Sequence, residues 1–112
     1  MTRCASCRPG DPCERHFTAQ IVQLARLQGF MVYHTWNSIH SQPGWPDLVL
    51  LRGPTMLCIE VKREGRKMTP AQEEWMTALQ HVETVRASCW RPSDWPDIEQ
   101  ALARRPSEAR AT

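Results

Sequence analysis

The spacing of apolar residues along the chain predicts a helix, three strands, a second helix, a fourth strand and a third helix, in that order. Short apolar runs indicate strands, and apolar residues that recur every three to four positions indicate helices. Such an order is typical of an α/β domain in which helices flank a mixed sheet. The expected strands are residues 30–35, 46–52, 55–63 and 84–91.

Capping signals mark the starts of the first two helices. Asp11 and Glu14 have the spacing of a capping box, with a proline at the first helical position, and Thr69 and Gln72 repeat this arrangement. The apolar stripe of the first helix, extended backwards, includes Glu14, so its carboxylate is expected to point toward the core side. The alternative is that Glu14 only caps its own helix. Gln72 is expected to approach the sheet, because it shares the apolar stripe of the second helix, namely Trp75, Met76, Leu79 and Val82.

The second and third strands carry charges that packing alone does not explain. They flank the turn signal Gly53-Pro54, so an antiparallel hairpin is expected. Asp47 lies at the start of the first of them, and Glu60 and Lys62 occupy alternate positions of the other, on one face. Both faces of residues 55–63 are otherwise largely apolar, which predicts a central strand. An ionised group without a partner is costly to bury there, and a bound metal ion would explain it.

Asp47 and Glu60 can lie close together in an antiparallel pair and share a cation. Hard oxygen ligands favour Mg²⁺ or Mn²⁺. Lys62 leaves the same face about 7 Å further along the strand, where its ammonium can hold a water or neutralise negative charge. Two carboxylates and an amine in this arrangement suit metal-assisted hydrolysis of a phosphodiester. The alternative is a surface aspartate together with a solvated Glu–Lys pair on an edge strand.

Length, composition and charge narrow the class of protein. A chain of 112 residues, of which 41% are hydrophobic, forms one small domain. No apolar run has the length of a membrane span, and the first residues lack the apolar region of a secretory signal, so a cytoplasmic protein is expected. The net charge of +2 provides no strong global field, so a nucleic-acid partner would have to meet a local basic patch.

Two segments are candidates for contact with nucleic acid. Arg63, Arg66 and Lys67 directly follow the charged strand, where they are expected either to contact phosphates or to form a solvated turn. The loop before Asp47 offers a second set of side chains, for which local structural roles are the alternative. This second set is His34, Trp36, Asn37 and His40.

The five cysteines do not form a disulfide framework, because their number is odd and no export signal is present. Cys58 and Cys89 lie in apolar strands and are expected in the core. The remaining three combine with a histidine in a Cys₃His set, with Cys-x₂-Cys and Cys-x₂-His spacings, that would suit structural Zn²⁺. Such an ion would staple the N-terminus to the first helix; the alternative is a cluster without metal. The set is Cys4, Cys7, Cys13 and His16.

Four ordered segments resemble the PD-(D/E)XK nuclease superfamily, and within it the VRR-NUC (virus-type replication-repair nuclease) group found in phage and bacterial single-domain proteins. The segments are Gly44-Trp45-Pro46-Asp47, Ile59-Glu60-Val61-Lys62, the stretch from Gly65 to Trp75 and the closing stretch from Cys89 to Trp95. The resemblance implies a restriction-endonuclease-like αβββαβ core over residues 14–104. A Cys-rich segment would precede it at residues 1–13, and a flexible tail would follow at residues 105–112.

The resemblance also implies an activity and roles for individual residues. Asp47, Glu60 and the main-chain carbonyl of Val61 match the metal ligands, and Lys62 matches the catalytic lysine. Gln72 matches the glutamine that opens the second helix, and Glu14 fits the acid of the first helix, which is a further candidate metal ligand. The implied protein is a homodimeric, Mg²⁺- or Mn²⁺-dependent endonuclease of branched DNA such as Holliday junctions, acting in replication, recombination or repair, in the host cytoplasm if phage-encoded. A non-catalytic nucleic-acid-binding module and an RNA-directed nuclease are the alternatives.

Overall fold

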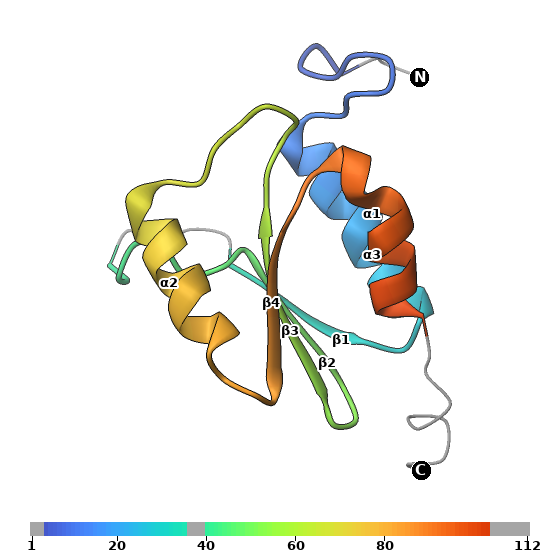
Figure 1. The fold of residues 1–112 in the computed structure, drawn as a ribbon. Helices are drawn as coiled ribbons and strands as arrows, with labels where there is room; N and C mark the ends of the chain where they lie inside the picture. The colour runs from blue at the N-terminus through green and yellow to red at the C-terminus, as the bar shows by residue number, and fades with distance from the viewer. Residues whose placement is uncertain (1–3, 36–39, 104–112) are drawn as a thin grey trace.

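The computed structural model describes residues 4–35 and 40–103, and within them it confirms the predicted order of elements (Figure 1). The expected tail at residues 105–112 and the loop residues Trp36 and Asn37 lie outside the described residues. No helix in the described part of the chain combines the length and the apolar character needed to cross a bilayer. The elements are α1 (Glu14–Leu27), β1 (Met31–His34), β2 (Leu48–Arg52), β3 (Thr55–Val61), α2 (Pro70–Gln80), β4 (Val85–Trp90), a 3₁₀ turn η1 (Pro92–Asp94) and α3 (Trp95–Leu102).

The strands form a mixed sheet in the order β1-β2-β3-β4. Strand β2 pairs antiparallel with both β1 and β3, which confirms the expected hairpin, while β4 runs parallel to β3 after the crossover through α2. Strand β3 therefore has a neighbour on each side, as its two apolar faces predicted. The register places Leu48 opposite Ile59 and Glu60 opposite Cys89, so the first residues of β2 and the last residues of β3 lie at the same end of the sheet.

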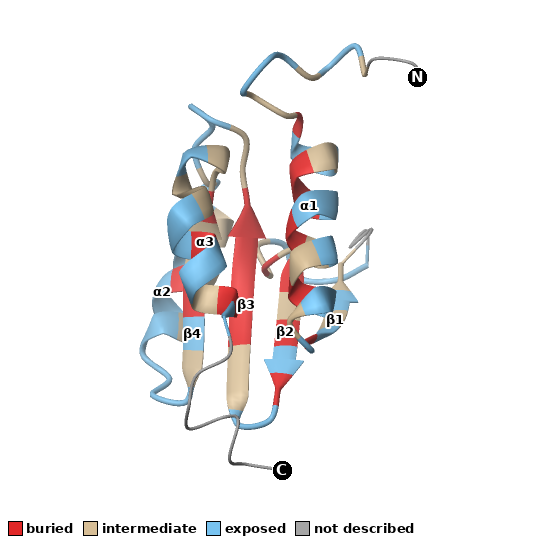
Figure 2. Ribbon diagram, turned by 90° about the vertical axis from the view of Figure 1, so that its right-hand side faces the viewer, coloured by how far each residue is buried: buried red, intermediate tan, exposed pale blue. Residues whose placement is uncertain are grey.

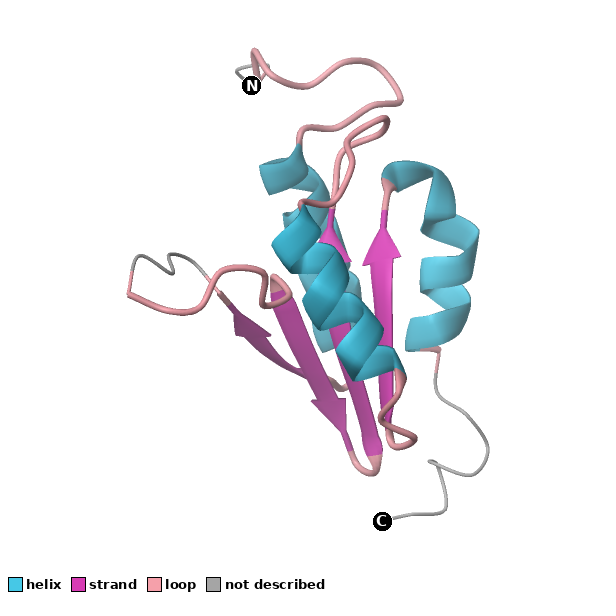
Figure 3. Cartoon of the chain, turned by 60° about the vertical axis from the view of Figure 1, so that its left-hand side comes forward, coloured by secondary structure: helices cyan, strands magenta, loops and turns pink. Residues whose placement is uncertain are grey.

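Helices cover both faces of the sheet: α1 and α3 pack on one face and α2 on the other (Figures 1 and 3). Alternate residues of β3 divide between the two cores, with Leu57 and Ile59 facing α1 and α3, and Cys58 facing Met76 of α2. Strand β3 is the most continuously buried strand in Figure 2. Since side chains alternate along a strand, Glu60 shares the face of Cys58, which is the face that α2 covers.

Arg52 connects the C-terminal ends of α1 and α3, a role that sequence patterns did not indicate. Its guanidinium donates hydrogen bonds to the carbonyls of Gln28 (2.8 Å), Leu102 (2.9 Å) and Ala103 (3.1 Å). It also lies over the ring of Phe30, 4.2 Å from the centroid. These carbonyls follow the last turns of α1 and α3, where intrahelical donors are missing, so one buried cation satisfies both helix ends.

The structure corrects two local expectations and confirms a third. Helix α1 begins at Glu14 with Cys13 as N-cap and without a side-chain cap, so the expected capping box at Asp11 is wrong. Asp11 instead pairs its backbone with that of Arg8, which turns the chain before the helix starts. Val82 follows the end of α2 and is 44% exposed, so it does not belong to the buried stripe. The capping box at Thr69 is present as predicted.

Candidate active site

Asp47 stands at the start of β2, where two backbone segments hold it. Its carbonyl accepts a hydrogen bond from the amide of Thr35 (2.8 Å), and its side-chain Oδ2 accepts one from the amide of Val61 (2.8 Å). The second bond crosses from β2 to the end of β3 and fixes the carboxylate beside Glu60. The structure thus brings together the two acids that the hairpin register was expected to juxtapose.

Glu60 is a buried acid, with 2% of its surface exposed. Its Oε1 accepts a hydrogen bond from Nε2 of Gln72 (3.1 Å), and its carboxyl also shares a hydrogen bond with Asp47. Burial, followed by the bond to Asp47 and the charge of Asp47, raises the pKa of Glu60 to about 9. Glu60 therefore holds a proton at neutral pH when no cation is bound, since two adjacent carboxylates repel each other.

Glu14 and Lys62 belong to the same electrostatic neighbourhood. Loss of hydration and the charge of Asp47 raise the pKa of Glu14, and the positive charges of Lys62 and Arg66 oppose that rise. Glu14 nevertheless lies at the rim with its side chain exposed, while Lys62 is half-buried. The amide of Lys62 donates to the carbonyl of Trp90 (3.0 Å), so β4 fixes the backbone of the lysine. Three acids and one amine thus surround the end of β3.

Gln72 connects the start of α2 to the buried acid. Its Oε1 accepts from the amide of Thr69 (2.9 Å) in the capping box, while its Nε2 donates to Glu60. One side chain thus fixes the helix start and orients the carboxyl, in agreement with the expectation that Gln72 approaches the sheet.

The loop before Asp47 is fixed against α2. Trp45 meets Trp75 edge to face, with 5.4 Å between ring centroids. Gly44 has a φ of +103°, and a Cβ at this position would lie 2.4 Å from the carbonyl oxygen of Ala71. Only glycine allows this approach, so residue 44 determines how the segment that carries Asp47 rests on the helix.

The basic residues after β3 separate into two kinds. Arg63 forms an ion pair with Asp11 (3.3 Å), so its guanidinium is engaged in holding the N-terminal segment. Arg66 and Lys67 are exposed, and Arg66 is close enough for its charge to act on Glu14. The two latter residues, rather than Arg63, are therefore available to an anionic ligand.

An open cavity of about 1070 Å³ lies along α1 and β1 and ends at Asp47 and Glu14. Half-buried His34 borders it, whereas His40 is exposed and does not line it. Sequence reasoning missed the α1 side of this cavity, although its spacing offered a signal: polar and small residues recur there every three to four positions, as on one helix face. They are Arg15, Ala19, Gln23 and Arg26.

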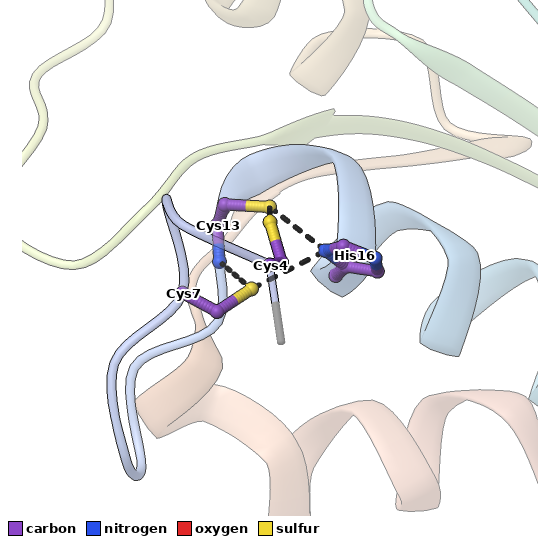
Figure 4. A group of neighbouring side chains, drawn as sticks. All are labelled: Cys4, Cys7, Cys13 and His16. Atoms are coloured by element: carbon purple, nitrogen blue, oxygen red, sulfur yellow. Dashed lines mark hydrogen bonds between the residues drawn. The ribbon is translucent and has the colours of Figure 1, made fainter. Parts of the chain in front are cut away.

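A second cluster lies at the N-terminal end of α1, where four side chains point toward one another (Figure 4). The ligand atoms of Cys4, Cys7, Cys13 and His16 all lie within 4.8 Å of one another, and the group could hold a metal ion. The backbone of His16 chiefly lowers the pKa of the Cys13 thiol, to about 6. Of the two other cysteines, Cys58 is buried as expected and Cys89 is half-buried.

Comparison with known proteins gives a family and a fold. The sequence profile of the VRR-NUC domain matches residues 12–89, while no curated protein matches the chain. Among solved structures, one described as a "VRR_NUC domain protein" matches with a TM-score of 0.61 and 23% identity, over 80% of this chain and 86% of that chain. The sheet, the flanking helices and the strand order described above fit this match. Because the profile spans more than half of the chain, the protein belongs to the VRR-NUC domain family, a family of nuclease type.

Proposed function

We propose that the protein is a divalent-metal-dependent DNA endonuclease. The observation that carries this proposal is the convergence of Asp47 and Glu60 at the end of β3, with Lys62 directly after the strand. A binding module would gain nothing from burying a carboxyl that stays protonated, whereas a cation between the two acids removes the repulsion that raises the pKa of Glu60.

The oxygen donors fit Mg²⁺ or Mn²⁺. Asp47, Glu60 and the main-chain carbonyl of Val61 would hold the ion, and Glu14 at the rim would reach it directly or through water. When bound, the ion polarises the phosphoryl oxygen and acidifies a bound water. Lys62 neutralises the charge that develops on the phosphate. Gln72 keeps the carboxyl of Glu60 turned toward Asp47.

We further propose that the substrate is branched DNA. Arg66 and Lys67 would meet phosphates beside the site, and the cavity along α1 leads away from Asp47 and Glu14 with Arg15 and Arg26 on its wall. One site cuts one strand per visit, so symmetric cutting of a four-way junction would require a two-fold dimer. The proposed setting is DNA replication, recombination or repair in the cytoplasm.

The test incubates a four-way junction, duplex DNA, single-stranded DNA and RNA with the protein in Mg²⁺, in Mn²⁺ and without divalent ions. Cleavage of the junction should require the ion, and Glu60→Gln and Lys62→Ala should each lower the rate roughly 100-fold or more. Glu99→Gln, an exposed change on α3, serves as the matched control. Sedimentation of the junction complex should show two chains.

Each alternative function predicts a different result in this experiment. Cleavage that continues without divalent ions, or with Lys62→Ala at the control rate, would contradict the mechanism. Faster cleavage of RNA would favour an RNA-directed nuclease. Tight DNA binding without cleavage in either ion would favour a non-catalytic module.

A further inference from the structure

We propose that Cys4, Cys7, Cys13 and His16 bind one structural Zn²⁺, and that this ion holds the first turn of α1 in the place from which Glu14 serves the nuclease site. The second half of this inference rests on the proposed function, whereas the first half stands on the geometry of the cluster alone.

Three ligand-to-ligand distances in the cluster are near those of ligands that share a central ion, with the sulfur–sulfur distance slightly longer and the two nitrogen–sulfur distances somewhat shorter. Sγ of Cys4 lies 3.9 Å from Sγ of Cys13, and Nδ1 of His16 lies 3.1 Å from Sγ of Cys13 and 3.2 Å from Sγ of Cys7. Tetrahedral zinc, with bonds of about 2.3 Å to sulfur and about 2.0 Å to nitrogen, separates its ligands by roughly 3.5–3.8 Å. A disulfide would require about 2.05 Å between sulfurs, and the three cysteines of the cluster are free.

The donor set discriminates between metals. Three thiolates and an imidazole are soft or borderline ligands, which suit Zn²⁺ and are poor partners for the Mg²⁺ or Mn²⁺ proposed at the carboxylates. The amide of Cys13 donates to Sγ of Cys7 (3.2 Å), and such an N–H donor supports a sulfur that carries negative charge. The two metal centres would therefore select different ions.

A tight turn allows the two ligand pairs to meet although only five residues separate Cys7 from Cys13. Arg8 and Asp11 exchange two backbone hydrogen bonds (3.0 and 2.9 Å), which close a turn between Cys7 and Cys13. Gly10 in this turn has a φ of +73°, a conformation that glycine adopts without strain. Cys13 and His16 are three residues apart at the start of α1 and face the same side.

The cluster connects to the nuclease site through two routes. Cys13 is the N-cap of α1 and directly precedes Glu14, and this helix start has no side-chain cap. An ion bound to Cys13 and His16 would therefore supply the anchoring that a cap normally gives. In addition, Asp11 lies within the ligand segment and pairs with Arg63, which follows Lys62 directly. Loss of the ion should therefore loosen the start of α1 and weaken the ion pair between Asp11 and Arg63 at the same time.

The first experiment determines the zinc content of the full chain, purified under reducing conditions and treated with a thiol reagent that releases bound metal. We expect about one zinc per chain in the wild type and less than a tenth of this in Cys7→Ser and Cys13→Ser. Cys89→Ser, which removes a thiol outside the cluster, should keep its zinc. Cobalt added to the zinc-free protein should give the visible bands of a tetrahedral thiolate site. Absence of zinc together with absence of these bands would overturn the site.

The second experiment measures the coupling without using cleavage as the readout. Binding of Mn²⁺ to the carboxylates is followed by water-proton relaxation in the zinc-loaded wild type and in Cys7→Ser, and amide exchange is followed at residues 14–17. We expect Cys7→Ser to bind Mn²⁺ about tenfold more weakly, as loss of outer-shell support does, and to exchange faster in the first turn. Cys7→His, which restores a ligand, should recover both properties.

The outcomes separate the two proposals. If the wild type holds zinc and Cys7→Ser does not, but both bind Mn²⁺ equally tightly and exchange their first-turn amides at the same rate, the coupling is refuted. Protein that holds zinc but neither binds Mn²⁺ nor cleaves DNA would refute the proposed function while supporting the zinc site.

Discussion

Replacing Glu60 with glutamine tests whether the proximity of Asp47 and Glu60 destabilises the folded protein when no divalent ion is bound. The amide has the shape of the protonated carboxyl, so it can still accept from Gln72 and donate to Asp47. It cannot ionise and therefore cannot serve as an anionic metal ligand. We expect Glu60→Gln to be more stable than the wild type without divalent ions, and to lose both metal binding and cleavage.

The magnitude follows from the pKa of Glu60, which rises from 4.5 to about 9 in the folded protein. Between these values the folded state holds a proton that the unfolded state has lost, so stability falls as pH rises. At pH 7 this difference corresponds to about 3 kcal/mol, and the advantage of Glu60→Gln should grow by about 1.4 kcal/mol per pH unit across this window.

The assay is urea unfolding of both proteins at several pH values between 5 and 8. Mg²⁺ and Mn²⁺ are removed by passage over a chelating resin, and no soluble chelator is added, so that zinc bound at the cysteine cluster stays in place. A parallel series with excess Mg²⁺ should stabilise the wild type increasingly as pH rises, because the ion replaces the proton, and should leave Glu60→Gln unchanged.

Two results would refute this reasoning. If Glu60→Gln is less stable than the wild type at pH 8 without divalent ions, the carboxyl is ionised and well accommodated in the metal-free fold. If the difference between the two proteins does not change with pH, Glu60 does not titrate in the expected window. Either result would remove the argument that the fold is built to receive a cation.

Two further predictions concern the packing that supports the site. Gly44→Ala should lower stability by at least about 2 kcal/mol and abolish cleavage, because the new Cβ would lie 2.4 Å from the Ala71 carbonyl oxygen and 2.6 Å from Trp75. Thermal melts should show a smaller effect for Gly53→Ala, which also has a positive φ (+55°) but where no atom lies in the way of the Cβ. Arg52→Met should lower stability by about 3 kcal/mol, since three helix-end carbonyls lose their donor, and an unchanged urea midpoint would contradict this.

Sequence patterns sufficed for the order of elements and for the face of β3 that carries Glu60, because both depend on local periodicity. They also predicted that Gln72 approaches the sheet, since a capping box and an apolar stripe together fix which way the residue at the third helical position points; its hydrogen bond to Glu60 comes from the structure. They failed at Arg52, whose partners are backbone carbonyls at residues 28, 102 and 103, which no side-chain pattern encodes. They also failed at the start of α1, where the pairing of Arg8 with Asp11 overrides the capping signal.

The site residues fall into two groups for the same reason. Asp47 and Glu60 come from neighbouring strands of one hairpin, so register alone places them together. Glu14 comes from a helix distant in sequence, and only the packing of α1 on the sheet decides that its carboxylate reaches the rim of the same site. The basic residues needed the structure too, because the ion pair between Arg63 and Asp11 is invisible in the sequence.

The parallel pairing of β3 with β4 governs when the site can form. The amide of Lys62 is held by the carbonyl of Trp90, and Glu60 stands opposite Cys89, so the lysine and the buried acid depend on a strand that follows the whole of α2. Closing such a long connection is slow compared with closing a hairpin. A chain without β4 therefore lacks both the carbonyl that fixes the backbone of Lys62 and the strand that lies beside Glu60, so the proposed site would be complete only once β4 has paired with β3.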